Sequence, residues 1–524
     1  MRRPMTPLLA LHRARQLYAD KTAVACGEHV ATYREFGSRV DRLAWALDQQ
    51  LAVQAGDRVA VLSPNCHRLL EAYFAVPVIG GVLLPLNVRL RVDELAFILV
   101  DAGVEVLLVH PDFAELTRDL VGQAPNLSHI VWLDTRPVRV GDLAYEDLLR
   151  RPSELSPLRF AGSEDDVAEI FYTSGTTGRP KGVMLTHRNL YSLAVQTITA
   201  LALGDEEVFL HSLPLYHANG WGAPHALTFV GGTHVVVPYP RPALVAEAVA
   251  EWRVTLAYMV PTMLIQLLAA GVPRHALRSL SRIVVGGAAP APALGRQVAD
   301  AWGSRVIGAY GLTEHSPVAT FAEVPHHWRL TPEQRHRVEV AAGVPMIGVE
   351  TRLVAEDGHD VPQDGRSIGE LWLRSDTVMK GYWRRPEETA EVLTADGWLR
   401  TGDLATISPQ GLVTIVDRAK DIVISGGENI SSVEIEAVLA DHPAVLECAV
   451  VAAPDAVWGE RPHAFVVLRP RAVCTPETLQ GWCRDRLAHF KAPDVVHVVA
   501  DLPKTGTGKI QKAALRECLR HSPS

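Results

Sequence analysis

Residues 172–182 read Tyr-Thr-Ser-Gly-Thr-Thr-Gly-Arg-Pro-Lys-Gly, and no other stretch of the chain is as informative. Its three glycines let the backbone turn tightly and present N–H groups to an anion. Four serine and threonine hydroxyls add hydrogen-bond donors, and Lys181 adds a positive charge. The preceding residues, Val167–Phe171, have the composition of a β-strand. The stretch therefore predicts a loop that follows a strand and binds a polyphosphate.

This loop differs from a Walker A loop, in which Gly-Lys-Ser/Thr leads directly into a helix. Here Pro180 precedes the lysine and Gly182 follows it. A solvated turn between two strands is the alternative interpretation, and this stretch alone leaves it open.

On both sides of the loop, apolar strand patterns alternate with helical ones up to about residue 300, as at Arg58–Leu62 and Ile283–Val285. Such alternation is typical of parallel sheets that are covered by helices on both faces. Ligands of these sheets bind beyond the carboxyl ends of the strands. We therefore expect the glycine-rich segments 172–182, 286–290 and 308–314 to converge there.

The pattern changes in residues 343–417, where Asp-Gly turn pairs separate short strands. We expect a small β-barrel subdomain here, followed by mixed α and β elements to the end of the chain. The predicted fold class is thus α/β, with a large N-terminal domain of two doubly wound β-sheets and this subdomain. A small α+β domain completes it. The predicted domains are 1–418 and 419–524, with the boundary near Lys420.

Composition excludes several classes of protein. The 524 residues include 51 basic and 59 acidic side chains, a net charge of −8, and contain no long basic run, so we expect no nucleic-acid partner. The six cysteines are scattered without a Cys-x-x-Cys pair, which argues against a disulfide framework or a zinc site and favours a cytoplasmic location. The longest apolar run, 69–86, is interrupted by charge, glycine and proline. It predicts a buried helix and a buried strand, not a transmembrane segment.

Four further segments carry groups suited to a nucleotide. Tyr310–Glu314 offers an aromatic face for a purine and a carboxylate for Mg²⁺. Gly286–Pro290 is poor in side chains, so a flat ring can approach its backbone. The carboxylate of Asp403 can accept hydrogen bonds from a ribose diol, and Leu502–Ile510 is a second loop with lysines. Each segment alone is also compatible with a plain turn or a surface loop.

Taken with the 172–182 loop, these segments follow the order found in the adenylate-forming superfamily, which includes acyl-CoA synthetases, adenylation domains of peptide synthetases and luciferases. The chain resembles this superfamily over nearly its whole length. The resemblance implies ATP, Mg²⁺ and CoA as cofactors.

The resemblance also implies roles for individual residues. It assigns the ATP phosphates to Thr173, Ser174, Gly175, Thr176, Thr177 and Lys181. It assigns adenine and ribose to Gly287, Ala288, Ala289, Tyr310, Asp403 and Arg418. Thr176 and Glu314 would hold the metal, and Thr313 would lie near the α-phosphate. Lys509 would be the catalytic lysine that reaches the substrate carboxylate and the α-phosphate, with His217 against that carboxylate.

The resemblance assigns three further positions to the binding of CoA or to the hinge between the domains. In relatives that form thioesters, the glycine turn that contains Gly427 lets pantetheine pass. Arg89 matches a nucleotide-phosphate contact in some CoA ligases, and an ordinary exposed arginine is the alternative. Lys420 occupies the hinge position of the family, where one residue absorbs a large backbone change, so the resemblance implies that the small C-terminal domain is mobile.

The segment Leu213–Gly222 bears on the substrate. No acidic residue occurs between Leu210 and Thr233, and a buried ammonium without a partner would be costly, so we expect a carboxylic acid without an α-amine. For Trp221, simple packing and a role in lining or gating the acyl pocket are both open. The expected pocket residues are His217, Trp221, Gly286, Gly308 and Leu312.

The leading hypothesis is an ATP-dependent acyl-CoA synthetase that activates a hydrophobic acid, either fatty-acid-like or a bulky ring acid. A stand-alone enzyme that loads a carrier protein is the first alternative. A luciferase-like oxygenase and a catalytically silent nucleotide-binding protein remain as others. A homodimer is one possible assembly.

Overall fold

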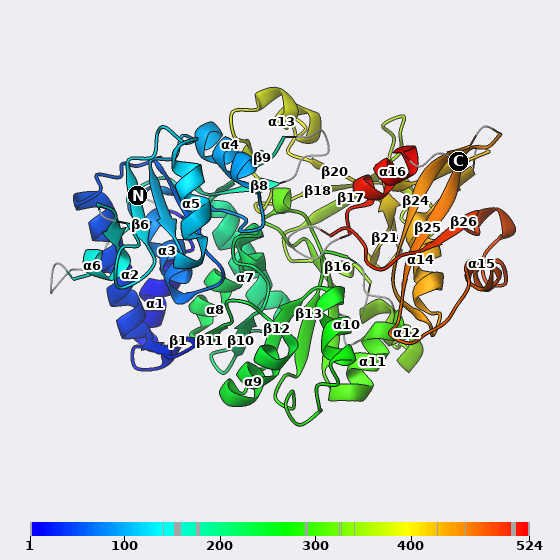
Figure 1. Cartoon of the computed structure of the whole chain (residues 1–524), viewed down its shortest axis with the longest axis horizontal. Helices are drawn as coiled ribbons and strands as arrows, with labels where there is room; N and C mark the ends of the chain where they lie inside the picture. The colour runs from blue at the N-terminus through cyan, green and yellow to red at the C-terminus, as the bar shows by residue number, and fades with distance from the viewer. Residues whose placement is uncertain are drawn as a thin grey trace.

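The structure is a computed structural model. It describes residues 3–139, 141–150, 159–173, 179–288, 292–323, 325, 327–339, 341–426, 428–455, 457–504 and 510–521. Two large sheets, a smaller antiparallel sheet and a C-terminal sheet follow one another along the molecule (Figure 1). The C-terminal elements lie at the end opposite the first helices (Figure 1). Among the described residues, no helix combines the length and apolar character needed to cross a bilayer. All six cysteines are free.

The first large sheet contains the loop of residues 172–182 between two of its strands. Its order is β19 (Gly381–Tyr382), β9 (Lys181–Thr186), β8 (Val167–Thr173), β4 (Val82–Pro85), β3 (Arg58–Leu62), β5 (Val106–Val109), β6 (His129–Trp132) and β7 (Leu143–Ala144). The strands from β8 to β7 run parallel to one another. At one edge, β9 pairs antiparallel with β8, and β19 pairs antiparallel with β9. The strand expected before the loop is confirmed.

Helices cover both faces of this sheet because alternate strand residues are apolar on each side. One face packs against α2 (Tyr33–Gln49) and α3 (His67–Val78), and the other against α4 (Val92–Ala102) and α5 (Ala114–Val121). The apolar run 69–86 thus forms most of α3 and all of β4, as predicted.

The second large sheet carries the other two glycine-rich segments. Its order is β16 (Val344–Pro345), β15 (Thr320–Phe321), β14 (Arg305–Tyr310), β13 (Arg282–Val285), β12 (Leu256–Met259), β10 (Val208–His211), β11 (Thr233–Val236), β1 (Thr22–Cys26) and β2 (His29–Thr32). Its outer face is covered by α9 (Pro242–Trp252), α10 (Pro261–Ala269) and α11 (Pro292–Trp302). Its inner face packs on α7 (His187–Leu201), α8 (Ala223–Val230) and the small sheet. Two doubly wound sheets are therefore present, as expected.

The small subdomain differs in one respect from the prediction. Its antiparallel strands are ordered β17 (Glu350–Val354), β18 (Gly369–Arg374), β20 (Leu399–Ile407) and β21 (Val413–Arg418), with β17 and β21 at opposite edges. A barrel closes only when its outer strands pair. In the described part of the chain, Val413 of β21 bridges Gly343 instead. The expected barrel is thus an open sheet, one face of which packs on the core of the second large sheet.

The C-terminal elements form a separate sheet with its own core. The order is β23 (Glu428–Ile430), β22 (Val423–Ser425), β25 (Gly459–Leu468) and β24 (Val445–Asp455), with β26 (Val495–Val498) beside β25. One face packs on α14 (Ser432–Ala440) and α15 (Pro476–Arg484), and the other on α16 (Lys512–His521). The smaller α+β domain of the prediction is present, while the boundary at 418 and its mobility stay predictions.

Short elements complete the chain. The remaining helices are α1 (Leu9–Leu17), α6 (Tyr145–Leu148), α12 (Pro332–Glu339) and α13 (Pro386–Val392). The 3₁₀ turns are η1 (Pro111–Phe113), η2 (Ala218–Gly222), η3 (Thr313–His315), η4 (Ala419–Asp421) and η5 (His489–Lys491).

Candidate functional site

The expected phosphate loop connects two antiparallel strands. Thr173, the last residue of β8, pairs with Lys181, the first residue of β9. Ser174, Gly175, Thr176 and Thr177 lie outside the described residues. The base of the loop is anchored to α4, since the Tyr172 hydroxyl donates to Asp101 Oδ2 at 2.6 Å. Arg385 binds the same carboxylate at 3.0 Å. The Tyr172 contact holds the end of β8, and the pairing of Thr173 with Lys181 holds the start of β9 beside it.

Lys181 contacts two side chains that come from far along the chain. Its ammonium lies 2.5 Å from Glu388 Oε2 on α13. It also lies 5.2 Å from the ring centroid of Tyr382 on β19, within the range of a cation–π contact. Both partners are near because β19 pairs with β9. Lys181 therefore has a defined position at the edge of the predicted phosphate loop.

Glu314 is hydrogen-bonded to Tyr382, the residue whose ring also contacts Lys181. It lies on η3, directly after the buried Thr313. The Tyr382 hydroxyl donates to Glu314 Oε1 at 2.9 Å, and the Met379 amide donates to the Glu314 carbonyl at 2.8 Å. One tyrosine thus links the expected metal ligand with the expected phosphate ligand. The proximity of segments 172–182 and 308–314 is confirmed by these contacts.

The residues expected to hold ribose also meet. The Tyr310 hydroxyl donates to Asp403 Oδ2 at 2.6 Å, and Arg418 Nε lies 3.2 Å from Asp403 Oδ1. Register explains the second contact, because Asp403 of β20 pairs with Arg418 of β21. Burial and then the Asp403 carboxylate raise the pKa of Tyr310 well above its usual value, so its hydroxyl stays a donor. This trio places a carboxylate and a guanidinium next to an aromatic ring.

The predicted adenine wall and acyl pocket share Gly286. A Cβ at this position would lie 2.6 Å from Cη2 of Trp221 and 3.0 Å from the Ala309 carbonyl oxygen. The Trp221 ring therefore lies directly over the Gly286 backbone, and only glycine permits this approach. Trp221 is 8% exposed, and its ring is 5.7 Å from that of Tyr258. It is packed in the core of the second large sheet, next to the expected adenine wall.

The other expected pocket and wall residues are distributed around this contact. Gly287 has a φ of +79°, which favours glycine, and Ala288 follows it; Ala289 lies outside the described residues. Gly308 pairs with Val285 in the sheet, and Leu312 packs against the core of the second large sheet.

His217 and Arg89 lie on neighbouring loops. His217 is exposed and directly precedes η2, and its amide donates to the Pro214 carbonyl at 3.1 Å. Arg89, also exposed, is hydrogen-bonded to the side chain of the adjacent Tyr216. Burial raises the pKa of Tyr216, and the Arg89 charge opposes that effect. The two candidates are thus close to each other and accessible from solvent.

Of the candidates in the C-terminal part, Gly427 and Lys509 lie outside the described residues. The segment containing Lys509 begins and ends at a bridge between Lys504 and Ile510. Gly426 donates its amide to the Trp458 carbonyl at 2.8 Å. Lys420 lies on η4, and its carbonyl accepts from Arg516 of α16 at 3.3 Å.

Sequence reasoning missed three residues that shape this region. Tyr382 and Glu388 contact Lys181, as described above. Asn65 holds the segment that precedes the candidate residues His217 and Trp221, since its amide donates to the Leu213 carbonyl at 2.8 Å and its Oδ1 accepts from the Leu215 amide at 2.7 Å. No local pattern marks these residues, because their partners are distant in the sequence.

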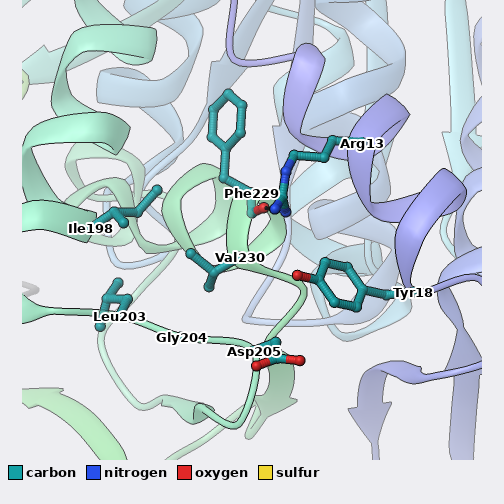
Figure 2. A pocket seen from close by; sticks show the side chains of 8 residues that line it. All are labelled: Arg13, Tyr18, Ile198, Leu203, Gly204, Asp205, Phe229 and Val230. Carbon is teal, nitrogen blue, oxygen red and sulfur yellow. Dashed lines mark hydrogen bonds between the residues drawn. The ribbon is translucent and has the colours of Figure 1, made fainter.

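A surface pocket of about 430 Å³ lies elsewhere, between α1 and the ends of α7 and α8 (Figure 2). Its walls are formed by Arg13, Tyr18, Ile198, Leu203, Gly204, Asp205, Phe229 and Val230. None of these is a predicted site residue.

Known proteins and family models match the sequence of this chain over most of its length. The family model "AMP-binding enzyme" matches residues 11–383, and "AMP-binding enzyme C-terminal domain" matches residues 434–509. A long-chain-fatty-acid–CoA ligase from Thermus thermophilus is 40% identical over 521 residues, which covers 97% of this chain and 94% of that protein. The peroxisomal benzoate–CoA ligase of Arabidopsis thaliana is 36% identical over 541 residues, covering 98% and 93%.

A solved structure of similar fold is that of the anthranilate CoA ligase AuaEII in complex with anthranoyl-AMP. It superimposes with a TM-score of 0.89 at 28% identity, covering 99% of this chain and 98% of that one.

Proposed function

The chain belongs to the AMP-binding enzyme family and is an AMP-forming acid–CoA ligase, and from this premise we propose that it converts a hydrophobic carboxylic acid to its CoA thioester through an acyl-adenylate. ATP and CoA are substrates of this family. The observation that carries the proposal is the continuity of the site. Tyr310, expected at the ribose, and Glu314, expected at the metal and phosphates, are four residues apart, and this proximity supports the proposal that the two groups bind one nucleotide.

In the first half-reaction, an oxygen of the acid attacks the α-phosphorus of ATP. A carboxylate–phosphorus bond forms, the bond to the bridging oxygen breaks, and pyrophosphate leaves with the electron pair. Positioning and charge neutralisation supply most of the catalysis in such transfers. We assign charge neutralisation to Lys181 at the outer phosphates and to Lys509 at the α-phosphate. His217 is assigned to the carboxylate.

The residues present fit Mg²⁺, which prefers oxygen ligands. Glu314 offers a carboxylate whose Oε1 is already held by the Tyr382 hydroxyl. Thr176, the second expected ligand, lies outside the described residues. When bound, the ion would neutralise charge on the phosphates.

In the second half-reaction, the CoA sulfur, after losing its proton, attacks the acyl carbon. A carbon–sulfur bond forms and AMP leaves with the electrons of the broken carbon–oxygen bond. We assign the passage of pantetheine to the turn at Gly427, and contact with the CoA phosphates to Arg89. A change of domain orientation at Lys420 would exchange Lys509 for Gly427 at the active centre.

We propose that the acid is hydrophobic because the residues assigned to its pocket are largely apolar. Of these, Trp221 belongs to the core of the second large sheet and Leu312 packs against it. No acidic residue lies between Leu210 and Thr233 to pair with an amine. Curated relatives named for long-chain fatty acids and for benzoate agree with either a chain or a ring.

Pyrophosphate release across a panel of carboxylic acids, with and without CoA, tests the proposal. We expect release to require both ATP and a hydrophobic acid, and AMP turnover to require CoA. Lys509→Ala should lower the first step by about 10²–10³-fold and largely spare thioester formation from supplied acyl-adenylate. Acid-independent release would contradict the proposal, and turnover with a carrier protein but not CoA would favour the carrier-loading alternative.

A further inference from the structure

Tyr382 contacts two of the charged residues that the proposed function places at the triphosphate and its metal, Glu314 and Lys181. Its hydroxyl donates to Glu314 Oε1 at 2.9 Å. The face of its ring lies beneath the Lys181 ammonium, 5.2 Å from the centroid. These two partners belong to different sheets, since Glu314 follows β14 and Lys181 begins β9.

The position of Tyr382 is fixed by its own surroundings. Its backbone pairs with Val183 of β9, and its amide donates to Thr389 Oγ1 at 2.9 Å. Thr389 in turn donates to the Arg385 carbonyl at 2.7 Å. Gly381 just before it has a φ of +143°, and a Cβ there would lie 2.8 Å from Thr389 Cγ2. The strand and α13 therefore hold the ring in one place.

The hydroxyl contact is made in a buried place. The Tyr382 side chain is only 8% exposed. Its hydrogen bond engages Oε1 of Glu314, which leaves Oε2 as the carboxylate oxygen that this hydroxyl does not engage.

We propose that Tyr382 is a positioning residue of the adenylation site: it orients Glu314 toward the metal of the metal–ATP complex and holds Lys181 beside the phosphates. This inference rests on the proposed function. It assigns separate parts of one side chain to separate partners, with the hydroxyl acting through Glu314 and the ring acting on Lys181. Hydrogen-bond partners of a metal ligand commonly change metal affinity by about 10–100-fold.

The competing view is that Tyr382 only fills space, because it is also a member of the core of the first sheet. Tyr33 provides a matched control. It is a fully buried tyrosine whose hydroxyl donates to the Gly232 carbonyl at 2.6 Å, in a contact without any predicted site residue. Loss of its hydroxyl reports the cost of a buried hydrogen bond alone.

The test compares Tyr382→Phe with Tyr33→Phe in the full-length protein. Binding of Mn²⁺ in the presence of α,β-methylene-ATP is followed by electron paramagnetic resonance, and Mg²⁺ dependence by pyrophosphate release. We expect Tyr382→Phe to raise the half-saturating concentration of both ions about tenfold, with Tyr33→Phe unchanged. Because the ring remains, affinity for the nucleotide without metal should stay within about twofold of wild type.

Tyr382→Leu removes the ring as well, so it should also weaken metal-free nucleotide binding. A double-mutant cycle with Glu314→Gln tests whether the Tyr382 hydroxyl acts through Glu314. In the Glu314→Gln background, Tyr382→Phe should not lower the affinity for Mn²⁺ or Mg²⁺ any further. Equal metal affinity in wild type and Tyr382→Phe, or fully additive effects in the cycle, would overturn the inference. Failure of the wild type to bind the Mn²⁺–nucleotide would instead contradict the proposed function.

Discussion

A single contact determines where the Trp221 indole lies in the proposed acyl pocket. Trp221 has a φ of +59° and lies over Gly286, where a Cβ would clash with its ring. A non-glycine residue at positive φ is uncommon and is retained only where the surroundings hold it. In the proposed acyl pocket, the indole would occupy space that an acyl chain or a ring could otherwise use.

Trp221→Ala should widen this space and change which acids are accepted. We expect kcat/KM to fall about tenfold for small acids that lose contact with the indole, and to rise for bulkier ones, since a pocket discriminates by about 1–3 kcal/mol per methylene-sized change. Pyrophosphate release over a series of acids measures this. Trp252→Ala on α9 is the control for loss of a partly buried tryptophan, and an unaltered acid preference would return Trp221 to simple packing.

At the scale of elements, the predicted link between the two domains coincides with a short helical turn, η4, that has contacts on both sides. Asp421 of η4 forms an ion pair with Arg516 of α16. Just before the turn, Asp417 Oδ2 accepts from the amide and hydroxyl of Ser432 at 2.6 and 2.7 Å. A reorientation at Lys420 would have to break or replace some of these contacts.

Lys420→Pro tests whether this turn is the hinge. Proline fixes φ near −65°, which the turn of η4 accommodates but a second backbone conformation need not. We expect adenylation to persist within about threefold and thioester formation from supplied acyl-adenylate to fall at least tenfold. Lys420→Ala leaves the backbone free to change conformation, so it should not cause the tenfold loss of thioester formation. Equal loss of adenylation and thioester formation in Lys420→Pro would contradict the assignment of Lys420 as the hinge.

At the scale of the whole molecule, several histidines are buried without charge. Burial lowers the pKa of His187, His211 and His225 to about 3, and that of His315 to about 4. An imidazole in the unfolded chain titrates near a pKa of about 6.5. Between these values the unfolded chain binds protons that the folded chain excludes, so stability rises with pH in this window.

The protein should therefore lose stability as the pH falls from about 6.5 toward 4. Each buried histidine can contribute up to about 1.4 kcal/mol per pH unit. Melting temperatures measured between pH 7.5 and 5 should fall, and His187→Gln should make the dependence shallower. His12→Gln, at an exposed position, should leave the slope unchanged. A melting temperature independent of pH over this range would contradict the prediction.

Much of the fold could be predicted because its signals are local. Apolar runs such as Arg58–Leu62 and Val167–Phe171 form strands where expected, and the run 69–86 forms the expected helix and strand. Closure of the small sheet was predicted wrongly, because strand composition does not specify which outer strands pair. The family assignment is confirmed by the matches to its two domain models. The domain boundary and the roles of individual site residues stay predictions.

The sequence pattern of neighbouring residues was enough to predict two strands joined by a loop at 167–186, the glycine-rich segments and the family. Long-range packing alone brought Tyr382 between Lys181 and Glu314, and Trp221 over Gly286. The physical reason is that a strand or loop pattern depends on neighbouring residues, whereas a side-chain contact depends on sheet order. Here β19 joins the edge of β9 after about two hundred intervening residues, and no periodicity in the chain encodes that pairing.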